Sequence, residues 1–188
     1  MTEMPVNAIY TPEYFMRQAL RHAQEAEEKG EVPIGAVVVW KNKIIARAGN
    51  LVETLKDGTA HAEMIALTQA SAAVGDWRLN ECCLYVTKEP CAMCAGAMVN
   101  CRLGKLVFGC PDPRMGAAGG ALNITNFPGM LHSVVVQSGI LQQECTSLIQ
   151  EFFRRRRQEF LTTNHTKNHE NSDGSGNDRF SSKDFSNQ

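Results

Sequence analysis

Two alternating spacings of apolar residues organise the first third of the chain. After Pro12, apolar residues recur every three or four positions until Gly30, and this spacing predicts an amphipathic helix. Residues 34–40 then form an apolar, β-branched run, which a polar turn at residues 41–43 separates from a second run at residues 44–48. Two such runs joined by a short polar turn predict a β-hairpin.

Helices and strands alternate through the following residues. The pattern predicts a helix over 62–74, a strand over 82–87, a helix over 91–100, strands at 106–108 and 134–136, and a final helix over about 141–161. Strands that alternate with helices indicate a sheet covered on both faces. The expected fold is therefore α/β, a three-layer α/β/α arrangement around a five-stranded mixed sheet.

The last part of the chain has a different composition. Residues 163–188 are dominated by polar residues and glycine, and Phe180 and Phe185 are their only large apolar side chains. Such a segment cannot bury enough surface to offset the entropy lost on ordering. It is predicted to be a disordered polar tail that follows one ordered domain over residues 8–162.

Composition narrows the class of protein. No apolar run approaches the roughly 20 residues that cross a bilayer, and the first residues lack an export signal, so we expect a cytoplasmic protein without a membrane segment. Seven cysteines in such a chain favour metal binding or burial over a disulfide framework. The net charge of −1 does not by itself point to a polyanionic partner, but four consecutive arginines at residues 154–157 can form a local basic site.

Two short segments carry the chemistry, His61-Ala62-Glu63 and Pro90-Cys91-Ala92-Met93-Cys94. Cys91 and Cys94 are one helical turn apart, so both thiolates can reach one metal, and Pro90 suits the first position of their helix. His61 is the best third ligand, because it is the only histidine with an acid two residues away. Since each helical residue advances about 100°, His61 must precede the regular helix if it and Glu63 face one pocket.

Each motif alone also has a simpler interpretation. A C-x-x-C pair can be a redox pair or two core residues, and a single His-x-Glu pattern indicates very little. Their combination in this order, with a proline before the first cysteine, favours a metal site. The remaining cysteines are assigned to core packing; they are Cys82, Cys83, Cys101, Cys110 and Cys145.

With these motifs the sequence resembles the cytidine/deoxycytidylate deaminase superfamily, whose established signature is H-x-E…P-C-x-x-C. Within it, the chain is similar to the bacterial tRNA-specific adenosine deaminases, which convert wobble adenosine to inosine. The resemblance runs from about Tyr14 to Phe160. It is carried by EVPIGAV (31–37), DGTAHAE (57–63), EPCAMCAGAM (89–98), GAAGG (116–120), FPGMLH (127–132) and FFRRRRQE (152–159).

The resemblance implies a cytidine-deaminase-like fold with one zinc per chain. It implies that His61, Cys91 and Cys94 bind this zinc and that Glu63 is the catalytic proton shuttle. A zinc-activated water would attack C6 of adenine, and inosine and ammonia would be the products. The implied partners are a tRNA anticodon stem-loop and a second copy of the chain in a homodimer.

The resemblance also places substrate contacts. Asn50 would contact the target nucleoside, Asp112 its sugar or a neighbouring nucleotide, and Phe153 with Arg154 and Arg156 the anticodon loop. From the residues alone, Asn50 and Asp112 can equally be turn residues. Four consecutive arginines on a helix span about 300°, so about two of them are expected to be solvated or paired.

Three residues near these positions depart from the family pattern. Lys88 stands where an apolar residue is usual, and Pro111 and Pro113 bracket Asp112. These departures bear on the substrate contacts and leave the reaction untouched.

Two other functions share part of this pattern. A deaminase of a free base or nucleotide, such as cytosine, guanine or dCMP, would share the zinc motif without needing the Phe-Arg run. A non-catalytic, zinc-stabilised RNA-binding module would keep the cysteines without needing Glu63. The presence of Glu63 favours catalysis.

Overall fold

The computed structural model describes residues 10–170, with side chains described as far as residue 162. The described residues up to Phe152 form one compact unit, and a second unit begins at Phe153. The elements are α1 (Pro12–Glu28), β1 (Gly35–Trp40), β2 (Lys43–Gly49), α2 (Val52–Leu55), α3 (Ala62–Val74), β3 (Cys82–Lys88), α4 (Ala92–Asn100), β4 (Lys105–Cys110), β5 (Val135–Ser138) and α5 (Gln142–Glu170). No helix in the described range is both long and apolar enough to cross a membrane.

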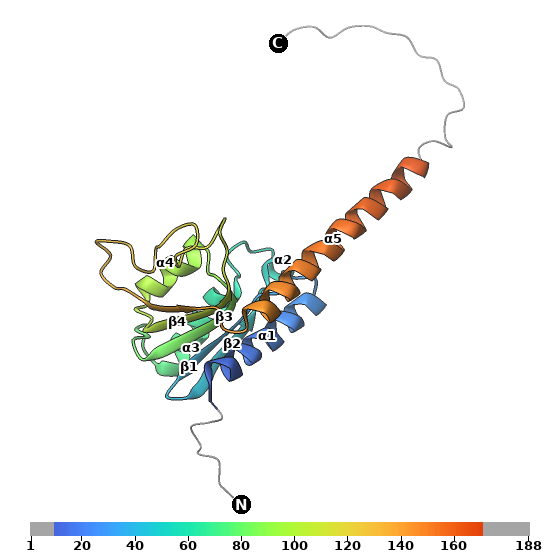
Figure 1. Ribbon diagram of the computed structural model, residues 1–188. Helices are drawn as coiled ribbons and strands as arrows, with labels where there is room; N and C mark the ends of the chain where they lie inside the picture. Colours follow the sequence, from blue (N-terminus) through green and yellow to red (C-terminus); the bar gives the residue numbers. More distant parts are fainter. Residues whose placement is uncertain (1–9, 171–188) are drawn as a thin grey trace, which may run out of the picture. The chain divides into compact units, whose positions relative to one another are not determined.

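One sheet holds the first unit together (Figure 1). Its strands lie in the order β2-β1-β3-β4-β5. β1 pairs antiparallel with β2 and β3, whereas β3–β4 and β4–β5 are parallel pairs. The predicted five-stranded mixed sheet is therefore confirmed.

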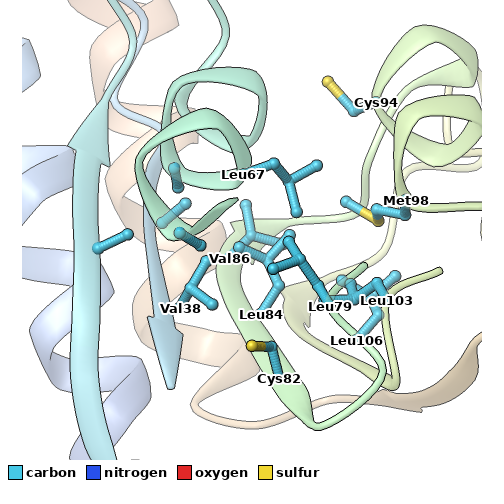
Figure 2. Packing of buried hydrophobic residues seen from close by; sticks show 14 of the residues in the cluster. Val38, Leu67, Leu79, Cys82, Leu84, Val86, Cys94, Met98, Leu103 and Leu106 are labelled. Atoms are coloured by element: carbon cyan, nitrogen blue, oxygen red, sulfur yellow. The ribbon is translucent and has the colours of Figure 1, made fainter. Parts of the chain in front are cut away.

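Two hydrophobic cores lie on opposite faces of this sheet. Along β1, Ala36 and Val38 belong to one core and Val37 and Val39 to the other, as the period of two in a strand requires. α3 and α4 cover the first face with Ala66, Leu67, Met98 and Val99. Figure 2 shows Leu67 and Met98 in this core. α1 and the beginning of α5 cover the second face with Phe15, Met16, Ala19, Cys145 and Ile149. The predicted three-layer arrangement follows from these contacts.

The predicted hairpin is present, and its turn and glycines have clear physical causes. Lys41 and Asn42 have φ values of 49° and 60°, as a two-residue hairpin turn of the type I′ class requires. Gly35 and Gly49 face each other across β1 and β2. A Cβ atom on Gly35 would lie 2.0 Å from the Ala19 carbonyl oxygen, so the glycine allows α1 to pack directly on the β1 backbone.

Several predicted boundaries differ from the structure. α2 was not predicted. β5 begins and ends later than the predicted 134–136, because pairing of Val135–Ser138 with β4 sets its extent. α5 continues past the predicted end near 161 to Glu170, since extending an existing helix costs little per residue. The remainder of the predicted tail lies outside the described residues, and the tail stays a prediction.

The five cysteines assigned to the core do pack there. Cys82, Cys110 and Cys145 are buried, Cys83 and Cys101 are half-buried, and all five pack in or against the two cores. All are free thiols. The expectation of burial without disulfides is confirmed for them.

Gly35→Ala should destabilise the first unit by about 2–3 kcal/mol, because the backbone of α1 cannot move away from the added methyl group. Denaturant unfolding followed by circular dichroism measures this. Gly96→Ala is the matched control: nothing lies within 4 Å of its added Cβ atom, and alanine favours the helix by about 0.5–1 kcal/mol. Equal stability of Gly35→Ala and the wild type would contradict the proposed packing.

Candidate metal centre

The N-termini of α3 and α4 meet at the site. His61 is the N-cap of α3 with extended backbone angles (φ −73°, ψ 149°), and Cys91 is the N-cap of α4 (φ −72°, ψ 174°). The expectation that His61 precedes the regular helix is therefore confirmed. The predicted place of Pro90 at the first helical position is wrong. That position belongs to Ala92, because Cys91 keeps the extended angles of the cap.

Three potential metal ligands converge at these caps. The Cys91 and Cys94 sulfur atoms lie 3.7 Å apart, and His61 Nδ1 lies 3.7 Å from the first and 3.5 Å from the second. Tetrahedral bonds of about 2.3 Å to sulfur and about 2.05 Å to nitrogen would separate two sulfurs by about 3.8 Å and sulfur from nitrogen by about 3.6 Å. The observed triangle therefore fits a tetrahedral ion of the size of zinc. Among the described residues it is the only such group.

The local environment favours an anionic sulfur. Hydrogen bonds with Cys94 and His61 lower the pKa of the Cys91 thiol to about 3. The same contact with Cys91, together with burial, raises the pKa of Cys94, and the hydrogen bond with Cys91 raises the pKa of His61. One negative charge is thus already stabilised among the three groups, and a divalent cation would favour the second thiolate.

Glu63 lies beside these ligands in the first turn of α3. Its side chain is buried, with 3% exposed, and burial raises the pKa of its carboxyl group. Oε2 is the only buried side-chain oxygen or nitrogen atom in the described residues without a hydrogen-bond partner. A buried carboxylate oxygen without a partner is costly and indicates that the site normally supplies one, such as a water molecule or a ligand.

Asn50 follows β2 and supports the start of α3. It is buried, its Oδ1 accepts a hydrogen bond of 2.9 Å from the Ala62 N–H, and its own N–H bonds the Ile34 carbonyl at 3.0 Å. Asn50 therefore fixes the helix end that carries His61 and Glu63. The described residues supply no acceptor for its side-chain NH2 group, so the predicted contact with a nucleoside stays compatible with this structural role.

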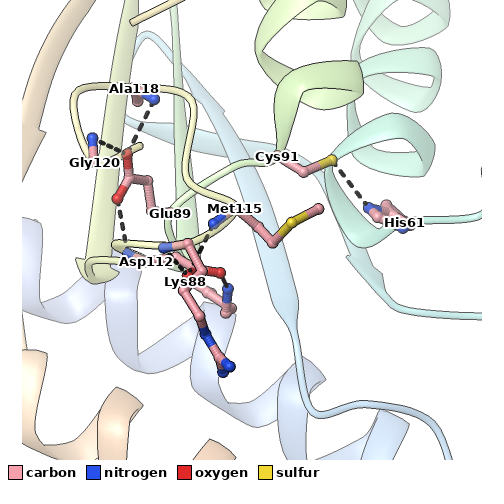
Figure 3. Close-up of polar contacts among 9 residues, drawn as sticks. His61, Lys88, Glu89, Cys91, Asp112, Met115, Ala118 and Gly120 are labelled. Atoms are coloured by element: carbon pink, nitrogen blue, oxygen red, sulfur yellow. Dashed lines mark hydrogen bonds and ion pairs between the residues drawn. The ribbon is translucent and has the colours of Figure 1, made fainter. Parts of the chain in front are cut away.

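Asp112 has several protein partners. Its carboxylate accepts hydrogen bonds from the Arg114 and Met115 N–H groups at 3.0 and 3.2 Å and forms an ion pair with Lys88 (Figure 3). Burial alone would raise the pKa of this carboxyl, but Lys88 and the two N–H groups lower it. The turn-forming role is therefore present, whereas the contact with a sugar or nucleotide stays a prediction.

Glu89 is a site residue that the sequence reasoning did not single out. It is buried, and its carboxylate accepts N–H bonds from Asp112 (2.8 Å), Ala118 (3.1 Å) and Gly120 (2.8 Å). An acid between a strand and Pro90, with a glycine-rich run about 30 residues later, was the only signal available. This pattern does not show which backbone N–H groups Glu89 bonds, because the fold brings those groups to it from the loop after β4.

The second unit carries the Phe-Arg run on α5. Phe153, Arg156 and Arg157 line one shallow pocket with Phe160 and Leu161. Arg155 lines a different pocket with Glu159, and Arg154 lies about 200° around the helix from Arg156. The four arginines are therefore spread around the helix, as expected. Arg156 lines the same pocket as Phe153. Its Nη1 atom lies 3.8 Å from Glu159 Oε2.

Comparison with known proteins gives one consistent result. The family model of MafB19-like deaminases matches residues 11–157. The chain is 49% identical over 142 residues to the tRNA-specific adenosine deaminase of Bacillus subtilis, an alignment that covers 76% of this chain and 88% of that protein. A solved structure from a study of A-to-I editing by deaminases at the wobble position of transfer RNA has a TM-score of 0.69 and 41% identity, over 72% of this chain and 98% of that one.

A more distant likeness shows the fold alone. A guanine deaminase from Nitrosomonas europaea has a TM-score of 0.65 at 22% identity, and the match covers 81% of this chain and 94% of that one. This chain therefore shares its architecture with a protein named for deamination of guanine, a free base. The fold alone does not determine which substrate is bound.

The purified protein should contain about one divalent metal ion per chain, and Cys91→Ala or Cys94→Ala should lose it, because each removes one of three ligands. Elemental analysis after gel filtration measures the metal. Cys101→Ala is the matched control, since its sulfur bonds the Met98 carbonyl and does not belong to the group of His61, Cys91 and Cys94. Stoichiometric metal in the Cys91→Ala/Cys94→Ala double mutant would refute the assignment.

Proposed function

Because this chain belongs to the MafB19-like deaminases and, among them, to the tRNA-specific adenosine deaminases, we propose that it converts adenosine to inosine at the wobble position of a tRNA anticodon loop. The reaction consumes one water and releases one ammonia. The single observation that carries the chemistry is the triangle of His61, Cys91 and Cys94 with the buried, unpartnered Glu63 oxygen beside it.

The donor set suits zinc, which prefers thiolate and imidazole ligands in this geometry. His61, Cys91 and Cys94 would hold one ion per chain. Zinc with three protein ligands acts as a Lewis acid that makes water a nucleophile near neutral pH. The proton transfers and the positioning of the substrate are assigned to residues of the chain.

Glu63 is proposed to move the protons. Its carboxylate accepts a proton from the attacking water and gives a proton to the adenine ring nitrogen as the water oxygen bonds C6. A second transfer through Glu63 protonates the exocyclic amine, whose bond to C6 breaks as the C6 carbonyl forms. The raised pKa of the buried Glu63 suits a group that must both accept and release a proton.

Asn50 is proposed to position the target nucleoside. Its Oδ1 is occupied by Ala62, which leaves the NH2 group to donate to the substrate. Asp112 would approach the sugar or a neighbouring nucleotide from the loop after β4, with its orientation fixed by Lys88. In both cases the protein contacts of the side chain are known, those of Asn50 with Ala62 and those of Asp112 with Lys88.

The anticodon loop is proposed to contact α5 beyond Phe152. Phe153 is 43% exposed, and the arginines next to it can bind the phosphate backbone while the ring stacks on a base. Arg156 and Arg157 are favoured over Arg155, because they share the pocket with Phe153. Arg154, which the family resemblance also places at the anticodon loop, is proposed to contact it from the neighbouring side of the helix.

Assembly and location stay predictions. A homodimer would need an apolar surface, and large apolar side chains are exposed on the segment between β4 and β5. They are Met115, Leu122, Phe127, Met130 and Leu131. A cytoplasmic location suits an enzyme that modifies tRNA.

Glu63→Gln should keep the metal and the fold but lower kcat on an anticodon stem-loop by about a thousandfold or more, because an amide cannot carry protons. Digestion of the RNA and mass spectrometry of the nucleosides measure inosine. Glu28→Gln removes the same charge from an exposed position at the end of α1 and should leave kcat unchanged. Turnover of Glu63→Gln within tenfold of the wild type would remove Glu63 from the mechanism.

Arg156→Ala and Arg157→Ala should each weaken stem-loop binding several-fold, because each loses a contact with a phosphate. Each should also reduce the slope of log K for binding against log salt concentration by about one. Fluorescence anisotropy at several salt concentrations measures both quantities. Arg155→Ala, on another face of the helix, is the matched control and should change little. If the four single variants and the quadruple variant all bind as the wild type does, α5 is not an RNA contact.

A further inference from the structure

The glycine-rich segment after β4 surrounds a buried side chain of the protein itself. The Glu89 carboxylate, 3% exposed, lies inside the turn formed by residues 112–120 and accepts N–H bonds from Asp112, Ala118 and Gly120 (Figure 3). Glycine-rich loops with convergent N–H groups commonly bind phosphate. Here the three N–H groups already have an anionic partner, so this segment is not a phosphate cradle.

The glycines of this segment are explained by that carboxylate. A Cβ atom on Gly116 would lie 2.3 Å from Glu89 Cδ, and one on Gly120 would lie 2.5 Å from Glu89 Oε2. Both positions also approach the Asp112 carbonyl, at 2.5 and 2.6 Å. Side chains at 116 and 120 would therefore push the carboxylate out of the turn.

The same contacts connect the turn to the metal ligands. The Glu89 N–H bonds the Cys110 carbonyl at 2.9 Å, and the Ala117 N–H bonds the Pro90 carbonyl at 2.8 Å. Cys91 is the next residue in the chain. The segment that leads to the metal ligand and the loop that carries Asp112 are thus joined on both sides of Glu89.

We propose that Glu89 is a positioning residue, an internal anion that holds the 112–120 loop in the conformation that receives the RNA substrate. It acts on substrate binding through Asp112 and takes no part in metal binding or proton transfer. The part of this proposal that concerns RNA rests on the proposed function. The part that concerns the loop stands on the three hydrogen bonds and the two glycines.

Glu89→Gln tests the proposal at single residues. Oε2 accepts from Asp112 and Oε1 from Ala118 and Gly120, so the amide of glutamine can accept on one side only and must place its NH2 group against an N–H on the other. Amide exchange followed by NMR should be at least about tenfold faster at Asp112, or else at Ala118 and Gly120, than in the wild type. KM for the stem-loop should rise about tenfold, with kcat within about threefold and metal content unchanged.

Glu31→Gln is the matched control. Glu31 is an equally buried carboxylate that accepts N–H bonds from Glu53 and Thr54, so its loss should loosen the α2 turn and leave amide exchange in 112–120 unchanged. If Glu89→Gln does not fold, Gly120→Ala displaces the carboxylate without changing charge and should give the same exchange and KM pattern.

Two results would overturn the proposal: unchanged exchange at all three amides, or a fall in kcat or metal content without a rise in KM. Absence of wild-type activity on the stem-loop would instead contradict the proposed function. In that case the exchange comparison still decides whether Glu89 holds the loop.

Discussion

The meeting of two helix N-termini at one end of the sheet is the constraint on which the site depends. α3 begins at His61 and α4 begins at Cys91, and both caps have extended backbone angles that turn their side chains toward each other. The N–H groups and dipoles at these two helix ends favour negative charge, which suits two thiolates and the Glu63 carboxylate. A shift of either helix by one residue would separate the ligands, so the cores under α3 and α4 hold the chemistry in place.

Buried carboxylates fix the loops around this point. Glu31 accepts the N–H groups at the start of α2, where hydrogen bonds from Glu53 and Thr54 outweigh the effect of burial and lower its pKa. Glu89 accepts the N–H groups of Asp112, Ala118 and Gly120 in the loop that carries Asp112. Asn50 completes the set by accepting from Ala62 at the start of α3. Irregular segments near the site are thereby ordered by polar groups rather than by apolar packing.

The sequence reveals the features that depend on local pattern. The period of the apolar residues predicts α1, Gly75 marks the end of α3, and the angle between successive helical residues requires His61 to lie at a cap. Features made by distant partners could not be found this way. α2 depends on Glu31, about 20 residues earlier, and Asp112 depends on Lys88 and Glu89. α2 is too short for its residues to show a helical period. Nothing in the local sequence around Asp112 indicates that Lys88 and Glu89 would contact it.

The substrate is tested most directly by comparing the wild-type protein on a defined set of molecules. An anticodon stem-loop with adenosine at the wobble position, the same loop with cytidine there, and free adenosine, cytosine and guanine would be incubated with the enzyme and the products identified by mass spectrometry. The account predicts inosine in the adenosine stem-loop and no comparable turnover of the others. Deamination of a free base, with the stem-loop adenosine unchanged, would contradict it.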